Sequence, residues 1–519
     1  MKRRGTAIGK LLLALALAAA ASGAHAEPTL VPVAAAPTLP GPLSGRLIVF
    51  ARKVTPGDDP AAPVDSSAFN PNGTAVAARE LPALGPGDTI WVDADSDAFP
   101  AAFSQLPPGR YRFQAVLDRN HDYNYGGRGQ GDVVSPIVEA TLPGIVPSLI
   151  LRDVIPGQPA ASSADRSAQV VPLDFASLRL SAFWGRPIHI RGWIGLPPAY
   201  DPASRASWPV VYSAGGFGST LETARQQAVD VVLRMADGDF APMIWVVLDQ
   251  SSPTGTHEFA DSVNNGPWGE ALTAELIPWL EQHYRMDARP NGRFLTGHSS
   301  GGWATLWLQT RYPKLFGGTW STSPDPSDFR DFTGIDIYAP GANAYVDAAG
   351  RPRPLVRDGA TELAGIGEFA RLENALGAYG GQFASFDWVF SPKGPDGRPM
   401  PLFDRRSGAI DPAVAAYWRA HYDIADRLAR DWASLKPDLD AKIHIFVGTA
   451  DTFRLEGSAH RLQAVLDGLG ARSTFEFIPN RNHFDLFEED GDPEGLMRRI
   501  TWDMYAIARP GAARPDLKR

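Results

Sequence analysis

The chain has 519 residues, a formal net charge of −9 at pH 7 and no cysteine. The lack of cysteine excludes disulfides, thiol catalysis and thiolate metal sites. The charge is acidic and contains no long run of one sign, which argues against a nucleic-acid-binding surface. A chain of this length can form two or three domains, each with a sizeable core.

Residues 1–26 have the pattern of a secretory signal peptide. MKRRGTAIGK is cationic, LLLALALAAAA is apolar, and small residues end the stretch at Ala24-His25-Ala26. A membrane anchor is the alternative, but the apolar run is shorter than the roughly 20 residues that span a bilayer. We therefore predict cleavage after Ala26 and export to the periplasm or the extracellular space. No comparably long apolar run follows, so we expect no membrane span.

A β-sandwich is predicted for residues 44–150. Residues 27–42 are rich in Pro and Ala and are expected to form a flexible lead. Short alternating apolar segments follow, with Gly, Pro, Asn and Asp between them: GRLIVFARKV, DTIWVDAD, GRYRFQAVLD and SPIVEATL. Short strands separated by turn residues are typical of a small sandwich. The polar segment PGQPAASSADRSA then predicts a linker.

One turn of this region carries a weak calcium motif. Asp118, Asn120 and Asp122 alternate in LDRNHDYNYGGRGQGD, followed by Asn124 and Asp132. Alternating Asp and Asn can surround Ca²⁺, but the Gly and Glu of an EF-hand loop are missing from their positions. An Asx-rich turn explains the same residues. We expect no other metal site and no cofactor.

Strand and helix patterns alternate over residues 165–511. VVPLDFASLRLSAF and PIHIRGWIGL are predicted to open the domain as an antiparallel pair, and WPVVYSAGG, APMIWVVLD, GRFLTGHS and KIHIFVGTAD are predicted strands between helices. Such alternation predicts a mostly parallel sheet with helices on both faces. Residues 325–435 interrupt it and are interpreted as an insertion, with AVAAYWRAHYDIADRLARDWASL as one helix.

A nucleophilic serine is predicted at Ser299, in the G-x-S-x-G sequence Gly297–Gly301. The motif alone is weak, and a Gly/Ser turn is the alternative. However, the predicted strand RFLT precedes it and the predicted helix GGWATLWLQ follows it. This strand–turn–helix setting is what a nucleophile elbow requires, because the tight turn holds the serine out above the sheet.

A serine hydroxyl needs a base to accept its proton and an acid to orient that base. His483 follows the strand in FEFIPNRNHFDLF and is the predicted base; His421, His444 and His460 are the competing histidines. Asp451 ends the strand IHIFVGTAD and is the predicted acid. Asp325 and Asp328, which follow GGTWSTSP, are its rivals.

Donors for an oxyanion complete the predicted site. The backbone N–H of Ser300, directly after the nucleophile, is one candidate. The other is the N–H of Phe217 in Gly215-Gly216-Phe217-Gly218, because flanking glycines let the backbone approach a substrate. In the insertion, the aromatic residues Phe386, Trp388, Phe390 and Trp418 are candidates for a substrate pocket, with ordinary core packing as the alternative.

The segments WPVVYSAGGFGS, NNGPWGEALTAELIPWLEQHYR, GRFLTGHSSGGWATLWL, IFVGTADTF and IPNRNH resemble the putative-esterase family of α/β hydrolases. That family includes esterase D-like enzymes, feruloyl and acetylxylan esterases, enterochelin esterases and mycolyltransferases. The resemblance covers about residues 190–505 and implies the α/β-hydrolase fold, the Ser299–Asp451–His483 triad and oxyanion donors at Phe217 and Ser300. Two departures are Gly215-Gly216, where the family has His-Gly, and the long insertion.

The sequence thus predicts a serine esterase that forms an acyl-enzyme and uses water as acceptor. Its expected substrate is a small-molecule ester or an ester linked to a polysaccharide. Acyl transfer to a sugar or lipid hydroxyl, or hydrolysis of siderophore lactones, is the alternative within enzymes, and a peptidase is disfavoured by the resemblance. A carbohydrate-binding protein with an inactive hydrolase domain is the alternative outside enzymes.

Overall fold

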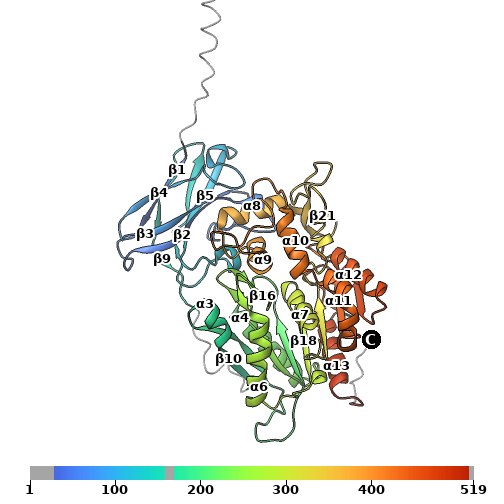
Figure 1. The fold of residues 1–519 in the computed structure, drawn as a ribbon. Coiled ribbons are helices and arrows are strands. Elements are labelled where there is room, and N and C mark those ends of the chain that lie inside the picture. The colour runs from blue at the N-terminus through green and yellow to red at the C-terminus, as the bar shows by residue number, and fades with distance from the viewer. Residues whose placement is uncertain (1–27, 158–168, 513–519) are drawn as a thin grey trace, which may run out of the picture.

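The computed structural model describes residues 28–157 and 169–512 (Figure 1). The predicted signal peptide and most of the predicted linker lie outside the described residues. Within the described ranges, no helix is long and apolar enough to cross a membrane.

The N-terminal region is a sandwich of two β-sheets, in agreement with the predicted class. One sheet has the order β4-β1-β8, and the other has the order β3-β2-β5-β6-β9 with β7 paired to β5. Buried aliphatic side chains from both sheets form one core. The strands are β1 (Leu30–Ala35), β2 (Leu43–Lys53), β3 (Ala75–Leu84), β4 (Thr89–Asp93), β5 (Gly109–Asp118), β6 (Val133–Val134), β7 (Val138–Leu142), β8 (Leu149–Leu151) and β9 (Asp153–Val154).

The flexible lead predicted for residues 27–42 is wrong over β1, and the sandwich is larger than the predicted 44–150. β1 pairs with β4 and β8, and β9 extends the sheet to Val154. Val31 and Val33 alternate with more exposed neighbours and are fully buried. The prediction rested on the Pro and Ala content of this stretch. The alternation of buried and more exposed residues, which has a period of two, is the stronger indicator of a strand.

The C-terminal region contains an eight-stranded sheet with the order β10-β11-β13-β12-β18-β19-β22-β23. β10 and β11 are antiparallel, as predicted, and the strands from β13 to β23 are parallel to one another. The strands are β10 (Val170–Ser177), β11 (Ile188–Gly195), β12 (Val210–Ala214), β13 (Ile244–Leu248), β18 (Arg293–His298), β19 (Gly318–Thr322), β22 (Ile443–Gly448) and β23 (Thr474–Ile478).

Helices cover both faces of this sheet. Val211 packs in a core with α4 (Leu221–Ala236) and α13 (Gly495–Ala508). Its neighbour Tyr212 packs in the opposite core, with α6 (Ile277–His283). Helices α7 (Ser300–Arg311), α11 (Ile424–Leu439) and α12 (Glu456–Gly468) pack in a further core with β22. Side chains of successive strand residues point to opposite faces, so the central strands β12, β13, β18 and β19 are buried on both sides. The predicted α/β-hydrolase fold is confirmed.

Most of the connection from β19 to β22 is the predicted insertion. It contains β20 (Pro354–Asp358), β21 (Thr361–Gly365), α8 (Ile366–Leu376), α9 (Gln382–Phe390) and α10 (Pro412–His421). The single helix predicted at its end is two helices, because the Asp423 carboxylate accepts the Asp426 N–H and starts α11. α11 packs against α7 and α12, so it is the crossover helix that a parallel strand pair requires. The predicted boundary at 435 therefore falls inside a helix of the main fold.

Short elements complete the chain. They are η1 (Pro71–Gly73), η2 (Phe103–Gln105), α2 (Tyr123–Gly126), α3 (Leu178–Trp184), β14 (Ser251–Ser252), β15 (Gly255–Thr256), β16 (Asp261–Ser262), β17 (Gly266–Pro267), α5 (Trp268–Ala271), η3 (Leu272–Leu276), η4 (Pro290–Gly292) and η5 (Phe329–Asp331).

Candidate active site

Ser299 lies in the tight turn between β18 and α7, where the sequence predicts a nucleophile elbow. Its backbone has φ 58° and ψ −124°. Such a conformation costs a non-glycine residue about 1–3 kcal/mol, and strain of this kind is concentrated at functional sites. Gly301 allows the close packing, because a Cβ there would lie 2.1 Å from the carbonyl oxygen of Ala214. The fold therefore holds Ser299 in a strained turn at the carboxyl end of β18.

His483 and Asp451 lie together at the same edge of the sheet. His483 Nδ1 is 2.9 Å from Asp451 Oδ2, and both side chains are buried. Burial by itself would raise the pKa of Asp451, but the charge and hydrogen bond of His483, together with the Phe453 N–H, hold it below its ordinary value. An ionised Asp451 fixes the proton on Nδ1 and leaves Nε2 as the basic nitrogen.

The rival acid Asp325 contacts the candidate nucleophile, Ser299. Its Oδ2 accepts the Ser300 hydroxyl at 2.6 Å, and its Oδ1 accepts the Ser299 hydroxyl at 3.4 Å. Burial raises the pKa of Asp325 to about 6, although these hydrogen bonds and the charge of His483 oppose the rise. The Ser299 hydrogen must turn from Asp325 to Nε2 before His483 can accept it. Hydrogen bonds of this kind commonly tighten only when substrate binds.

The other rivals lie elsewhere. Asp328 pairs with Arg330 and caps η5. Each competing histidine stacks on an aromatic ring: His421 on Tyr417, His444 on Trp320 and His460 on Phe477. The structure thus brings together Ser299, His483, Asp451 and Asp325.

The loop predicted to supply an oxyanion donor runs alongside Ser299. A Cβ on Gly216 would lie 3.1 Å from the Ser299 Cβ, so a larger residue would have to displace Ser299 by a few tenths of an ångström. The Ser219 N–H donates to the Gly216 carbonyl at 3.1 Å, which closes a turn with Phe217 at its tip. The carbonyl of the preceding residue, Gly215, accepts from the Gln250 side-chain amide. The loop position is compatible with the Phe217 and Ser300 N–H groups as donors.

Three residues near the site were not predicted from the sequence. Tyr125, from the β-sandwich, donates its hydroxyl to the Ser219 carbonyl at 2.7 Å, and its ring lies 4.9 Å from that of Phe217. Glu258 is fully buried, neither carboxylate oxygen has a hydrogen-bond partner, and burial and the charge of Asp325 raise its pKa well above the ordinary value. Phe69 lies beside the rings that flank His483.

The insertion contacts the loop that carries Asp451 and contributes part of the lining of a pocket. The Arg357 N–H donates to the Thr452 carbonyl and its side chain donates to the Asp451 carbonyl, both at 2.9 Å. Phe386 lines a small pocket that Asp325 also lines. Phe390 and Trp418 are buried in the core instead. Trp388 lines a separate pocket without triad residues among its lining.

The candidate calcium residues are only partly brought together. Carboxylate oxygens of Asp118, Asp122 and Asp132 lie within 4.8 Å of one another. Mutual repulsion and, above all, burial raise the pKa of Asp122 to about 6. Asn120 instead donates to the Gln130 carbonyl. Asp118 and Asp132 accept backbone N–H groups of the turn, as the Asx-turn alternative requires.

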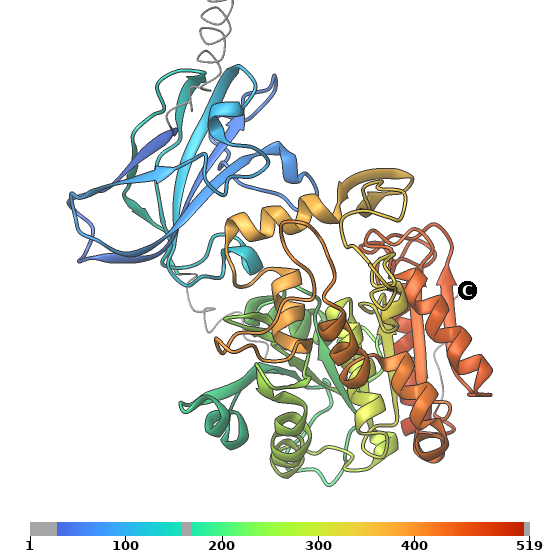
Figure 2. The same cartoon turned by 45° about the horizontal axis from the view of Figure 1, so that its top comes forward.

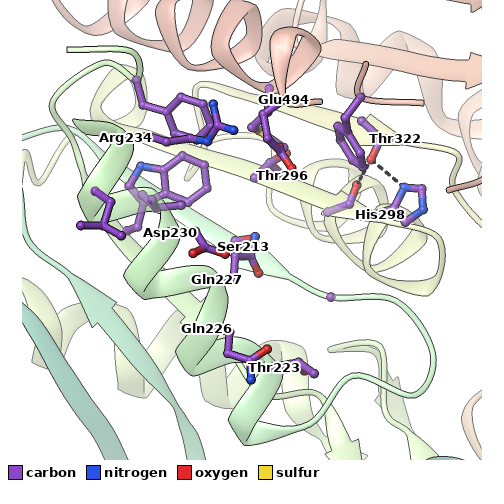
Figure 3. A pocket seen from close by; sticks show the side chains of 18 of the residues that line it. Ser213, Thr223, Gln226, Gln227, Asp230, Arg234, Thr296, His298, Thr322 and Glu494 are labelled. Carbon is purple, nitrogen blue, oxygen red and sulfur yellow. Dashed lines mark hydrogen bonds between the residues drawn. The ribbon is translucent and has the colours of Figure 1, made fainter. Parts of the chain in front are cut away.

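A larger cavity of about 850 Å³ lies between α4, α13 and the strand ends (Figure 3). The figure shows Gln227 and Asp230 of α4 on one side of the cavity and His298, which is hydrogen-bonded to Thr322, on the other. Burial, followed by the charge of His483, lowers the pKa of His298 to about 3. The His298 ring lies 4.3 Å from that of His483, whereas Ser299, Asp451 and His483 themselves do not line the cavity.

Solved structures similar to this chain include a ferulic acid esterase, with 14% identity and a TM-score of 0.39 over 66% of this chain and 97% of that one. An S-formylglutathione hydrolase from Agrobacterium tumefaciens is 16% identical, with a TM-score of 0.38 over 65% of this chain and 95% of that one.

The curated proteins "Esterase MT1326" and "Esterase Rv1288", from two strains of Mycobacterium tuberculosis, are each 29% identical over 157 residues. The match covers 30% of this chain and 33% of each relative, so the chain spans about a third of their length. The family model described as "Putative esterase" matches residues 181–484, which is more than half of the chain and includes Ser299, Asp451 and His483. The chain therefore belongs to the putative-esterase family.

Proposed function

We propose that the chain is an exported serine carboxylic-ester hydrolase with Ser299 as nucleophile, His483 as general base and Asp451 as the acid that orients it. The observation that carries the proposal is the 2.9 Å contact between His483 and Asp451 at the sheet edge where Ser299 lies in a strained turn. Membership of the esterase family supports the reaction class. Export rests on the pattern of residues 1–26.

In the proposed reaction, Ser299 Oγ attacks the ester carbonyl carbon while its proton moves to His483 Nε2. Asp451 stabilises the imidazolium that forms. The carbonyl oxygen becomes an oxyanion and accepts hydrogen bonds from the Phe217 and Ser300 N–H groups. His483 then donates its proton to the departing alcohol oxygen, which leaves an acyl group on Ser299. Water, deprotonated by His483, hydrolyses this ester and releases the acid.

Replacing Ser299 by Ala tests the assignment. The variant should fold normally, because the Ser299 Oγ makes only a 3.4 Å contact to Asp325. Loss of a triad member typically lowers kcat by about 10⁴–10⁶-fold. We expect hydrolysis of 4-nitrophenyl acetate and labelling by a fluorophosphonate probe to disappear together. Near-normal hydrolysis by the variant would remove Ser299 from the mechanism, and an unlabelled wild-type protein would favour a non-catalytic role.

A further inference from the structure

The β-sandwich borders the active site on two sides. On the oxyanion side, the ring of Tyr125 packs edge-on against Phe217. On the histidine side, the ring of Phe69 lies 6.1 Å from Phe453 and 5.8 Å from Phe484. These two rings in turn lie 4.9 Å and 5.3 Å from His483. The N-terminal domain therefore contributes side chains to the surroundings of both halves of the candidate machinery.

A pocket of about 310 Å³ lies in the seam between the sandwich and the insertion. We call it the seam pocket; its principal lining residues are Asp65, Tyr123, Tyr125, Phe217, Phe369 and Glu373. Figure 2 shows helix α8, which carries Phe369 and Glu373, directly beneath the sandwich. The volume is at the lower end of the range for small-molecule sites, about 300–1,000 Å³. Neither domain could form this pocket alone.

The seam pocket adjoins the surroundings of Ser299. Phe369 and Gln382 line the seam pocket and also a smaller pocket of about 30 Å³. Asp325, which accepts the Ser299 hydroxyl, lines that smaller pocket. From the other side, Phe217 belongs both to the seam pocket and to the loop that passes next to Ser299. The two pockets thus share a wall of Phe369 and Gln382, and a substrate attacked by Ser299 would reach the seam past these side chains.

The lining indicates what kind of group fits. Glu373 is 5% exposed, and its Oε1 accepts the Ala384 N–H, whereas its Oε2 has no hydrogen-bond partner. Oε2 has no contact with solvent, so the side chain must turn toward the seam pocket to meet a ligand hydroxyl. Because a buried polar atom without a partner costs about 1–3 kcal/mol, the resulting hydrogen bond would be favourable. Burial raises the pKa of Glu373 to about 7, which allows it to donate or accept. The described lining residues include two carboxylates but no lysine or arginine, which disfavours an anion.

We propose that the seam pocket is a substrate subsite that binds an uncharged, hydroxyl-bearing part of the ester, remote from the scissile bond. The inference rests on the proposed esterase function and adds to it the role of the N-terminal domain. The aromatic walls contact the apolar framework of this group, and Glu373 Oε2 exchanges a hydrogen bond with one of its hydroxyls. A phenol and a sugar share this chemistry.

Two pairs of ester substrates distinguish a phenol from a sugar. Within each pair, the two esters differ mainly in their hydroxyl groups. The phenol arm compares methyl 3-(4-hydroxyphenyl)propanoate with methyl 3-phenylpropanoate. The sugar arm compares methyl 6-O-acetylglucoside with cyclohexylmethyl acetate. For each pair, the measured quantity is the ratio of kcat/KM for the hydroxylated ester to that for its parent. We expect the wild-type ratio to exceed about ten in one arm, as for one well-formed buried hydrogen bond.

Ala68→Trp fills the seam pocket from an irregular loop and should reduce this ratio to about one. Ala61→Trp, the same change at an exposed residue outside the lining, should leave it unchanged. Glu373→Leu should also abolish the preference, and Glu373→Gln should restore part of it. Circular dichroism and hydrolysis of 4-nitrophenyl acetate report folding and the triad separately.

The subsite would be overturned if 4-nitrophenyl acetate is still hydrolysed but the wild-type protein gives a kcat/KM ratio near one for both ester pairs. An undiminished ratio in Ala68→Trp would also overturn it. Failure to hydrolyse any ester, including 4-nitrophenyl acetate, would instead overturn the proposed function, and the subsite with it.

Discussion

At the residue scale, the two rival carboxylates of the candidate site have different partners. Asp451 contacts the imidazole, whereas Asp325 contacts the hydroxyls of Ser299 and Ser300. The two carboxylates also differ in protonation: the pKa of Asp451 is held below its ordinary value, and that of Asp325 is raised to about 6. Asp451 is therefore the carboxylate that is hydrogen-bonded to the imidazole and ionised across the neutral range, whereas Asp325 has no hydrogen bond to His483 and becomes protonated below about pH 6.

Exchanging each carboxylate for an amide tests this difference. Asp451→Asn should lower kcat by roughly 10²–10⁴-fold with little change in KM, because the charge acts on the imidazolium that forms in the transition state. Asp325→Asn keeps an oxygen that can accept from Ser300, so we expect less than about a tenfold loss. Steady-state hydrolysis of 4-nitrophenyl acetate by both variants measures the effects. The reverse order would move the acid to Asp325 and leave Ser299 and His483 in place.

The sequence reasoning located the candidate triad because each member follows a predicted strand, and parallel strands bring their carboxyl ends to one edge. It could not identify Tyr125 or Glu258. Tyr125 lies more than 90 residues before the loop that it contacts, and no spacing rule connects two domains. Glu258 lies in a loop, and its burial depends on packing around it rather than on its neighbours in sequence.

At the scale of elements, the insertion shows how one buried residue can end one helix and start the next. The Asp423 carboxylate accepts the Asp426 N–H at 2.9 Å, and it also accepts the Phe329 N–H at 3.0 Å and the Tyr338 hydroxyl at 2.7 Å. It thereby fixes the start of α11 and ties η5 to it. Apolar periodicity continues across this break, which is why the sequence predicted a single helix there.

Asp423→Ala should therefore lower the free energy of unfolding by about 2–4 kcal/mol, since it removes a helix cap and leaves buried donors without an acceptor. Asp411→Ala is the matched control, because Asp411 caps α10 through the Ala413 and Val414 N–H groups and is only partly buried. We expect it to cost about 1 kcal/mol. Urea unfolding of both variants gives the comparison; equal losses would show that Asp423 acts as a helix cap only.

At the scale of the whole molecule, the fold class and the family were accessible from the sequence, whereas the relation between the domains was not. The predicted linker and the different strand patterns indicated two domains joined by a tether. In the structure, buried residues of the sandwich, among them Ile48, Phe50 and Tyr123, share a core with Leu372, Ala375 and Leu376 of α8. The sandwich packs on a helix of the insertion, and neither hydrophobic period nor turn residues predict which surfaces of two domains will pack together.

Arg46 joins the two domains by hydrogen bonds as well as by packing. Its Nε donates to the Leu376 carbonyl at 2.6 Å and its Nη2 to the Ala375 carbonyl at 2.9 Å. These carbonyls belong to the last turn of α8, whose carbonyl groups have no partner within the helix, and a cation there also interacts favourably with the helix dipole. A residue of the sandwich thus caps a helix of the insertion.

Replacing Arg46 by Met keeps the aliphatic part of the side chain but removes the charge, both hydrogen bonds across the seam and a third, more exposed bond to Glu80 within the sandwich. With hydrogen bonds to charged groups contributing about 1.5–3 kcal/mol each, the loss of the two across the seam should lower the free energy of unfolding by roughly 3–6 kcal/mol. Because these two bonds cross the seam, calorimetry should show one transition in the wild-type protein and two in the variant. Arg79→Met removes an exposed bond within the sandwich, to the Trp91 carbonyl, and should leave a single transition near the wild-type temperature. Identical behaviour of the two variants would mean that the domains are coupled by their shared apolar core and not by Arg46.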